Sequence, residues 1–220
     1  MKKVMCRILP VLVIAMVIAV VSGVAVAQQG GPIGEEFTTN YYANNTTSGA
    51  PPAWLRFTEH GSIADRECAM IYVFAPDQQL TECCGCLVTA NGLQTINVQT
   101  QLLGNTLTRV TPNTGVIQIV SGLPTSGGLT GPKGNNSPLC DPTNVAVAPE
   151  IDSWVTHVQN KVGATFPITE SRGDEEFLSD AEFSNITGSL EADCAFAERL
   201  GSGFGVCDCG KFENVGDGLH

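Results

Sequence analysis

Cysteine is the residue type in this chain that offers the most chemistry. The sequence contains nine cysteines, and five of them lie in the tight groups Cys83-Cys84-Gly85-Cys86 and Cys207-Asp208-Cys209. Thiols at short spacing form disulfides, bind a metal ion or exchange electrons. We interpret both groups as structural disulfide partners because both contain Cys-x-Cys spacing, whereas zinc knuckles usually use Cys-x₂₋₄-Cys and thioredoxin-like sites use Cys-x-x-Cys.

An even number of cysteines in an exported chain predicts disulfide bonds. Eight cysteines follow the apolar N-terminus and allow up to four bonds. Their connectivity stays open, because eight cysteines can pair in on the order of a hundred ways. No metal ion and no cofactor is expected. The predicted disulfide residues are Cys68, Cys83, Cys84, Cys86, Cys140, Cys194, Cys207 and Cys209.

The three histidines do not predict a catalytic site. His157 lies near Asp152 and Ser153, but closeness along the chain says little about triad geometry, and the sequence lacks a Gly-x-Ser-x-Gly motif. His60 lies in a polar stretch and His220 is the last residue. We therefore predict no catalytic histidine.

Carboxylates offer a second kind of chemistry. Glu170 and the run Asp174-Glu175-Glu176 are candidates for the acid pair of a glycoside hydrolase. Such a pair needs a defined separation across a cleft, which sequence spacing does not establish. An exported carboxylate-based hydrolase is therefore a less favoured alternative, and we predict no catalytic residue.

Residues 1–27 have the three parts of a secretory signal peptide. The segment opens with basic residues, residues 8–21 are almost wholly apolar, and Ala25-Val26-Ala27 is a small-x-small cleavage signal. A retained membrane anchor is the alternative, because an apolar stretch of this length just spans a bilayer. After cleavage no membrane span is expected. The protein is predicted to be secreted or held at the cell surface.

The chain is acidic. It has 220 residues, of which 43% are hydrophobic and 15% charged, as in a globular protein, and its formal net charge is −11. Nucleic acids are bound by clustered cations, so we expect no nucleic-acid partner. Residues 170–217 hold twelve of the acids. We interpret them as a solvated surface, and a cation-binding patch is the alternative.

The middle of the chain predicts antiparallel strands. Residues 70–75 form a continuous β-favouring apolar run, and residues 80–88 are a second candidate. Asn91-Gly92 then follows as a hairpin signal. Apolar and polar residues alternate over residues 96–102, and a fourth strand is expected over residues 116–120.

The hairpin would decide which way the clustered cysteines face. If Asn91-Gly92 is a two-residue loop, strand parity turns Cys83 toward the core and Cys84 and Cys86 toward the wet side. We therefore predict that Cys84 and Cys86 bond to segments crossing the outer face of the sheet, while Cys83 bonds inward. A bond between the neighbours Cys83 and Cys84 would be strained and is not expected.

The composition of the flanking segments predicts the domain organisation. Residues 28–53 are rich in Gly, Asn, Thr and Pro and predict a flexible or extended arm, with one strand over residues 37–42. Residues 54–220 form a single β-rich domain, in which residues 121–148 are a long loop anchored by Cys140.

The last third of the chain predicts three more strands and one helix. The strands are expected over residues 153–159, 165–169 and 176–183. Thr187 or Ser189 caps the helix, and Gly201 ends it.

One face of this helix carries an apolar stripe. Leu190, Cys194 and Ala197 share that face, so Cys194 would hold the helix to the sheet or to the cysteine-containing tail.

A resemblance adds to this interpretation. The cysteine framework is set in the segments Cys68-Ala69-Met70-Ile71-Tyr72-Val73-Phe74, Glu82-Cys83-Cys84-Gly85-Cys86, Thr89-Ala90-Asn91-Gly92-Leu93, Cys194-Ala195-Phe196 and Gly201-Ser202-Gly203-Phe204-Gly205-Val206-Cys207. They resemble a family of uncharacterised, cysteine-rich secreted bacterial proteins, over roughly residues 68–121 and 164–210. The resemblance implies export and disulfides and identifies no functional site.

The sequence as a whole predicts a mainly β fold: an antiparallel sandwich-like domain, stapled by disulfides, with one short C-terminal helix. The predicted function is that of a secreted non-catalytic protein, a surface, adhesive or assembly component with an unknown partner. Residues 36–47 would add as a strand to a neighbour's sheet. The alternative is a carbohydrate- or small-ligand-binding module that uses Trp54, Trp154 or Tyr41-Tyr42 as stacking surfaces.

Overall fold

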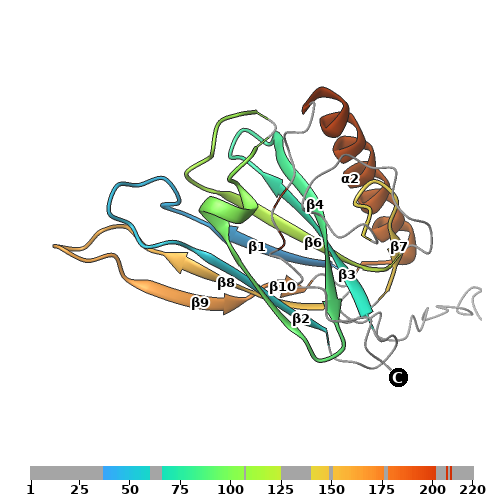
Figure 1. Ribbon diagram of the computed structural model, residues 1–220, viewed down its shortest axis with the longest axis horizontal. Coiled ribbons are helices and arrows are strands. Elements are labelled where there is room, and N and C mark those ends of the chain that lie inside the picture. The colour runs from blue at the N-terminus through green and yellow to red at the C-terminus, as the bar shows by residue number, and fades with distance from the viewer. Residues whose placement is uncertain are drawn as a thin grey trace, which may run out of the picture. The chain divides into compact units, whose positions relative to one another are not determined.

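Two antiparallel β-sheets form the body of the protein, and a helix lies against one of them (Figure 1). The computed structural model describes residues 37–59, 66–106, 108–124, 140–148, 151–175 and 178–201, together with Cys207 and Cys209. Within these residues the predicted fold class is confirmed, because the chain is mainly β and disulfide-stapled and has a C-terminal helix.

The first sheet, sheet A, has six strands in the order β10-β1-β6-β3-β4, with β7 paired to β6. Four of the strands predicted from sequence, over residues 37–42, 70–75, 80–88 and 116–120, belong to it. The bounds are β1 Phe37–Tyr42, β3 Arg66–Phe74, β4 Leu80–Thr89, β6 Gly115–Leu123, β7 Ala146–Val147 and β10 Asp174–Glu175.

Strand β1 belongs to the domain's own sheet. It pairs with β6 along its whole length and with β10 on its other side. One edge of its backbone is fully paired with β6, and the other is paired with β10 at Thr38 and Thr39. The prediction that this segment adds to a neighbour's sheet is wrong for the folded domain.

The second sheet, sheet B, has four strands in the order β5-β2-β8-β9. Its strand β2 was not predicted, although Leu55 and Phe57 alternate there with the polar residues Arg56 and Thr58, which is the pattern of a half-buried strand. The bounds are β2 Trp54–Glu59, β5 Leu93–Asn97, β8 Ile151–Val158 and β9 Ile168–Arg172.

Sheet A is buried on both faces. Toward sheet B, Ile71 of β3 joins a core with Leu55 and Phe57. On the opposite face, Met70 of β3 joins a second core with Leu190 of α2. This two-sided burial explains why β3 is continuously apolar rather than alternating.

Helix α2 (Asp180–Gly201) has 22 residues and begins earlier than predicted. Its start is a capping box, in which the Glu182 carboxylate accepts hydrogen bonds from the Ser179 backbone N–H at 3.0 Å and from the Ser179 hydroxyl at 2.6 Å. The strand expected over residues 176–183 is therefore wrong where the chain is described. The described helix runs to Gly201, the residue predicted to end it.

The Asn91-Gly92 turn is not a hairpin within one sheet. It carries the chain from β4 in sheet A to β5 in sheet B. Asn91 has a left-handed φ of 57°, but Gly92 does not have a positive φ, so the turn is not type I′. The Asn91 N–H instead donates to the carbonyl of Glu59 at the end of β2. The predicted register between residues 80–88 and 96–102 is therefore wrong.

The alternating segment after Asn91 is a strand only in its first half. After β5 the chain forms a single π-helical turn, η1 (Val98–Leu102). The Asn97 side chain accepts hydrogen bonds from the N–H groups of Gln99 and Thr100 at 3.0 Å, which caps this turn.

The segment predicted to be a long loop is partly ordered into the sheet. Strand β6 continues to Leu123, and β7 pairs with it near the far end of the segment. Among the described helices, none is long and apolar enough to span a membrane.

Candidate functional site

Four disulfides join all eight cysteines of the predicted set. The bonds are Cys68–Cys140, Cys83–Cys194, Cys84–Cys207 and Cys86–Cys209. The Cα atoms in each pair lie 5.5 or 5.8 Å apart, which is ordinary for a disulfide. Strand β4 supplies one partner to three of the bonds, and these three join it to parts of the chain more than 100 residues away.

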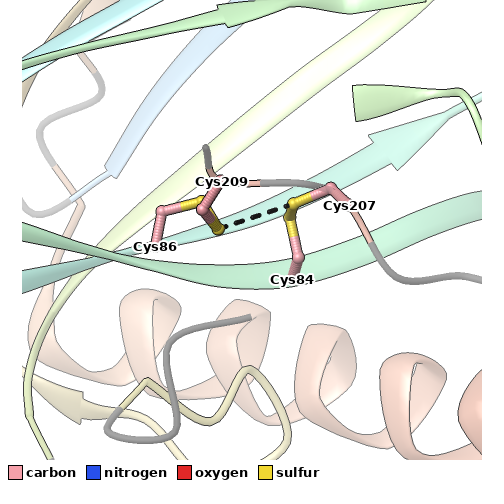
Figure 2. Close-up of side chains that lie close together, drawn as sticks. All are labelled: Cys84, Cys86, Cys207 and Cys209. Atoms are coloured by element: carbon pink, nitrogen blue, oxygen red, sulfur yellow. Dashed lines mark hydrogen bonds between the residues drawn. A yellow bond between two sulfur atoms is a disulfide. The ribbon is translucent and has the colours of Figure 1, made fainter. Parts of the chain in front are cut away.

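Two of these bonds lie side by side and form a four-sulfur cluster, Cys84, Cys86, Cys207 and Cys209 (Figure 2). The sulfurs of Cys207 and Cys209 are 3.9 Å apart, and all four sulfurs lie within 4.8 Å of one another. Every member is buried. Cys84 and Cys86 are two residues apart on one strand, so strand parity points both toward the same face.

The four-sulfur cluster lies on the opposite face from the one predicted. Cys84 and Cys86 belong to the core between the two sheets, and Cys83 belongs to the core beneath α2. The predicted parity is therefore confirmed, and the predicted sides are reversed. The wet side was assigned from the Asn91-Gly92 hairpin, which the structure does not form.

The same parity bears on redox chemistry. Cys83 and Cys86 do have the Cys-x-x-Cys spacing of thioredoxin-like sites, so the exclusion of that motif from sequence spacing was wrong. In a strand these two side chains point to opposite faces, and their sulfurs bond to Cys194 and Cys209. They do not form a dithiol pair with each other.

Cys83–Cys194 holds helix α2 to sheet A, which is the first of the two predicted roles of Cys194. Leu190 and Ala197 lie buried on the same helix face, as predicted. Glu198 is the third member of a small group with the two sulfurs. Burial raises the pKa of Glu198, and the charge of Asp141 raises it further.

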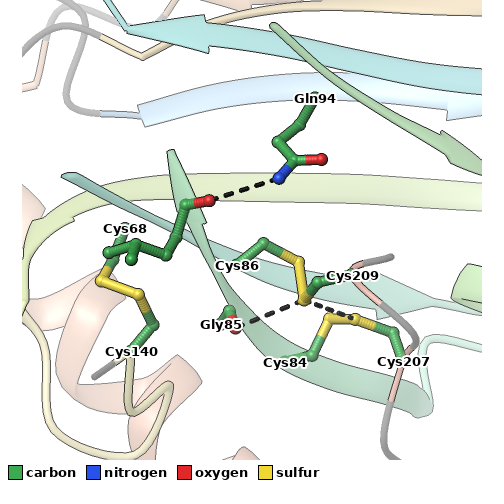
Figure 3. The surroundings of a disulfide bond; sticks show 9 residues. Cys68, Cys84, Gly85, Cys86, Gln94, Cys140, Cys207 and Cys209 are labelled. Carbon is green, nitrogen blue, oxygen red and sulfur yellow. Dashed lines mark hydrogen bonds between the residues drawn. A yellow bond between two sulfur atoms is a disulfide. The ribbon is translucent and has the colours of Figure 1, made fainter. Parts of the chain in front are cut away.

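Cys68–Cys140 fastens the segment after residue 139 to the face of sheet A that α2 covers. Gly85 of β4 approaches the Cys140 backbone closely, and both residues are labelled in Figure 3. A second contact holds the same segment, because the buried Tyr72 hydroxyl donates to the carbonyl of Pro142 at 2.7 Å. Cys140 thus anchors this segment, as predicted.

A buried acid precedes the four-sulfur cluster on β4. Glu82 is fully buried, and neither of its carboxyl oxygens has a hydrogen-bond partner from another side chain in the described part of the chain. Burial raises the pKa of Glu82 to about 9, a backbone hydrogen bond from Cys83 lowers it in part, and the charge of Glu198 raises it. Glu82 is therefore protonated at neutral pH.

The suggested triad of His157 with Asp152 and Ser153 does not form. The Ser153 hydroxyl bonds to Thr38 and Asn40 at 2.9 and 2.8 Å, and Asp152 pairs with an arginine. His157 lies instead within 2.5 Å of the Ser171 hydroxyl, measured from its Nε2.

His157 is buried and packs against an aromatic side chain. Its ring stacks on Tyr41, with 4.1 Å between the centroids, and burial lowers its pKa. His60 and His220 lie outside the described residues.

Two of the candidate carboxylates, Glu170 and Glu175, form ion pairs with arginines, and Asp174 lies exposed on β10. Glu170 pairs with Arg56, and Glu175 pairs with Arg172, which also pairs with Asp152. Glu176 lies outside the described residues. The two paired carboxylates act as partners in ion pairs across sheet B and its edge, and the structure does not assign them the acid and base roles of a hydrolase.

The candidate stacking aromatics divide into two groups. Tyr42 is fully buried in the core between the sheets, whereas Tyr41 is 53% exposed and stacks on His157. Trp54 and Trp154 are partly exposed and alternate with core residues, so both point away from the core on sheet B. Trp154 lies opposite Arg56, two residues beyond Trp54 on the neighbouring strand, so the two indoles are diagonal neighbours.

A surface groove at the C-terminal end of α2 was not predicted. It has a volume of about 480 Å³ and lies between the helix and the turn that joins β3 to β4. Phe196 and Leu200 line it and are about two-thirds exposed.

No family model, curated protein or solved structure matches this chain.

Proposed function

We propose that this chain is an exported, non-catalytic protein that works outside the cytosol as a surface or assembly component. The observation that carries the proposal is the set of four buried disulfides, since disulfides persist in oxidising compartments and are rare in the cytosol. The signal-like residues 1–27 support the same compartment.

The disulfides stabilise the folded chain, which suits a protein that works outside the cell. Three of them connect β4 to the C-terminal helix and tail, so they close loops of 111 and 123 residues. A cross-link of this span restricts the unfolded chain and contributes on the order of 4–5 kcal/mol in the chain-entropy account. Cys84–Cys207 and Cys86–Cys209 close almost the same loop, so the second of these two bonds adds much less than the first. The resulting domain is a rigid scaffold.

Strand β9 offers an edge for assembly. Within the described residues it pairs with β8 on one side only, and all of its residues are exposed. Ile168, at its start, is 53% exposed. An unpaired edge of this kind accepts an extended segment of another chain through main-chain hydrogen bonds. We therefore assign the assembly contact to β9 instead of to residues 36–47.

Export and assembly are tested separately. Intact mass after alkylation, with and without reductant, measures cleavage after Ala27 and the oxidation of all eight cysteines. Light scattering of the wild type and of Ile168→Lys measures assembly, because a lysine on an edge strand opposes pairing. Leu93→Lys, at a similarly exposed apolar position on β5, the opposite edge strand of sheet B, is the matched control.

We expect higher assemblies that Ile168→Lys reduces and Leu93→Lys leaves unchanged. If the wild type stays monomeric at all concentrations, the proposed assembly role is wrong. If protein recovered from outside the cytosol has reduced thiols, the disulfides no longer support the proposed location.

Carbohydrate binding is the second candidate, and the placement of Trp54 and Trp154 favours it. The two indoles share the outward face of sheet B, and Arg56 and Arg172 flank Trp154 on the neighbouring strands. Aromatic faces stack on the apolar faces of sugars, while charged side chains bond to hydroxyl groups.

This candidate is tested on a panel of immobilised oligosaccharides. We expect binding that the double variant Trp54→Ala/Trp154→Ala loses. Phe196→Ala, an exposed aromatic on α2, should retain it. Absence of binding by the wild type to every glycan would count against this function.

A further inference from the structure

The four-sulfur cluster has the composition of a metal site as well as of two disulfides. Cys84, Cys86, Cys207 and Cys209 each supply one sulfur, and these sulfurs are mutual neighbours within 4.8 Å (Figure 2). All four are buried, at 0 or 1% exposure. Four cysteine thiolates around one point are the ligand set of a closed structural zinc site.

We propose that, when both bonds of the cluster are reduced, these four cysteines bind one zinc ion or a chemically similar divalent cation as a tetrathiolate site. The inference rests on the geometry of the sulfurs and is independent of the proposed function. It assigns two states to one cluster: two disulfides when oxidised, and one metal centre when reduced.

The distances fit this assignment. Tetrahedral zinc with Zn–S bonds of about 2.3 Å holds its sulfurs roughly 3.8 Å apart. The sulfurs of Cys207 and Cys209, which belong to different disulfides, are already 3.9 Å apart. When the two S–S bonds break, the sulfur of Cys84 must move away from that of Cys207, and the sulfur of Cys86 from that of Cys209. Each pair must separate from bonding distance to about 3.8 Å, which is a change of roughly 2 Å.

The backbone of β4 prepares half of the site. Cys84 and Cys86 lie in the interior of a strand paired with β3, opposite Ile71 and Ala69. Their two sulfurs therefore stay on one face, at a fixed separation, even when the bonds to the tail are broken. The metal would recapture Cys207 and Cys209 and hold the tail on the sheet in place of the disulfides.

The chemistry balances with a named reductant. A phosphine takes an oxygen atom from water and becomes a phosphine oxide, and the two electrons and two protons released convert one disulfide into two thiols. Two phosphines thus yield four thiols. Zinc binding then displaces the four thiol protons to solvent, so the affinity rises with pH.

The other cysteines do not offer an equivalent site among the described residues. Cys83 and Cys194 have only Glu198 as a third ligand, and Cys68 and Cys140 belong to no such group. Their side chains provide matched controls, because all eight thiols are reduced together in the same experiment.

The test uses Co²⁺ as a spectroscopic probe on the purified, phosphine-reduced protein under anaerobic conditions. Tetrahedral thiolate-bound Co²⁺ has intense ligand-field and sulfur-to-metal charge-transfer bands. The variant Cys84→Ser/Cys86→Ser removes two proposed ligands, and Cys68→Ser/Cys140→Ser removes two cysteines outside the cluster. Zn²⁺ is then added to displace Co²⁺ and bleach the bands.

We expect one Co²⁺ per chain with the tetrathiolate spectrum in the wild type and in Cys68→Ser/Cys140→Ser. In Cys84→Ser/Cys86→Ser we expect at least a tenfold loss of affinity and no tetrathiolate bands. Absence of the bands in the reduced wild type would overturn the proposal. So would their retention in Cys84→Ser/Cys86→Ser or their loss in Cys68→Ser/Cys140→Ser, because either result places the ligands elsewhere.

Discussion

Cys83 and Cys84 are neighbours in the sequence, yet their sulfurs lie on opposite faces of sheet A. Cys83 bonds to Cys194 of α2, and Cys84 bonds to Cys207 within the core between the sheets. Two consecutive side chains of β4 thus enter two different buried cores, one on each face of sheet A. The strand serves as the attachment point for both the helix and the C-terminal tail.

The first prediction is the disulfide map itself. Peptide mapping of the unreduced protein, with fragmentation between Cys83 and Cys84, should recover Cys83 joined to Cys194 and Cys84 joined to Cys207. Strand parity requires the two bonds to diverge, because successive side chains point to opposite faces. A fragment in which Cys83 is joined to Cys84 or to Cys207 would contradict the assigned faces.

The second prediction concerns the close approach of Gly85 and Cys140. A Cβ atom at position 85 would lie 2.3 Å from the carbonyl oxygen of Cys140, which is backbone and does not move aside easily. We expect Gly85→Ala to lower the free energy of unfolding by about 1–3 kcal/mol. Thermal or denaturant unfolding under oxidising conditions measures it.

Gly188 provides the matched control for this substitution. It lies on the exposed side of α2, with no atom close to the position of an added Cβ. We expect Gly188→Ala to raise stability by about 0.5–1 kcal/mol, because alanine loses less backbone entropy than glycine in a helix. Equal changes in the free energy of unfolding for the two variants would show that the contact with Cys140 does not cause the loss of stability.

The third prediction is a pH dependence that originates at Glu82. Burial raises the pKa of Glu82 to about 9 from an ordinary value of 4.5. Between these two values the unfolded chain has lost the proton and the folded chain retains it, so stability falls as pH rises. One proton changes the free energy of unfolding by at most about 1.4 kcal/mol per pH unit.

Glu82→Gln removes this proton without removing the polar side chain. We expect the variant to be more stable than the wild type at pH 8, and the difference to disappear near pH 4. Denaturant unfolding across that range, analysed as the difference between the two proteins, cancels the contributions of other groups. A difference that does not vary with pH would show that Glu82 is ionised in the folded protein.

The fourth prediction tests the capping box at the start of α2. Ser179→Ala removes a hydroxyl that bonds to Glu182, so it should destabilise the protein by about 1 kcal/mol. Ser189→Ala is the control, since its hydroxyl only donates to the carbonyl of Asn185 within the helix. We expect the control to be neutral or slightly stabilising. Helicity and unfolding by circular dichroism distinguish the two.

Local patterns predicted most of the strands and one end of the helix. The strands expected over residues 70–75 and 116–120 are present, because the preference for a strand depends mainly on neighbouring residues. Leu190, Cys194 and Ala197 indicated the buried face of α2 for the same reason. The start of α2 was missed because the capping box of Ser179 and Glu182 lies before the apolar stripe.

The sequence alone determined that eight cysteines would be paired, and that Cys84 and Cys86 would face together while Cys83 faced away. These conclusions follow from composition and from the two-residue period of a strand. Only the tertiary structure decided which face was which, because Asn91-Gly92 joins two sheets instead of two strands of one sheet. It also decided that the tail reaches β4, since a contact between residues 123 positions apart depends on how whole layers pack and leaves no local pattern.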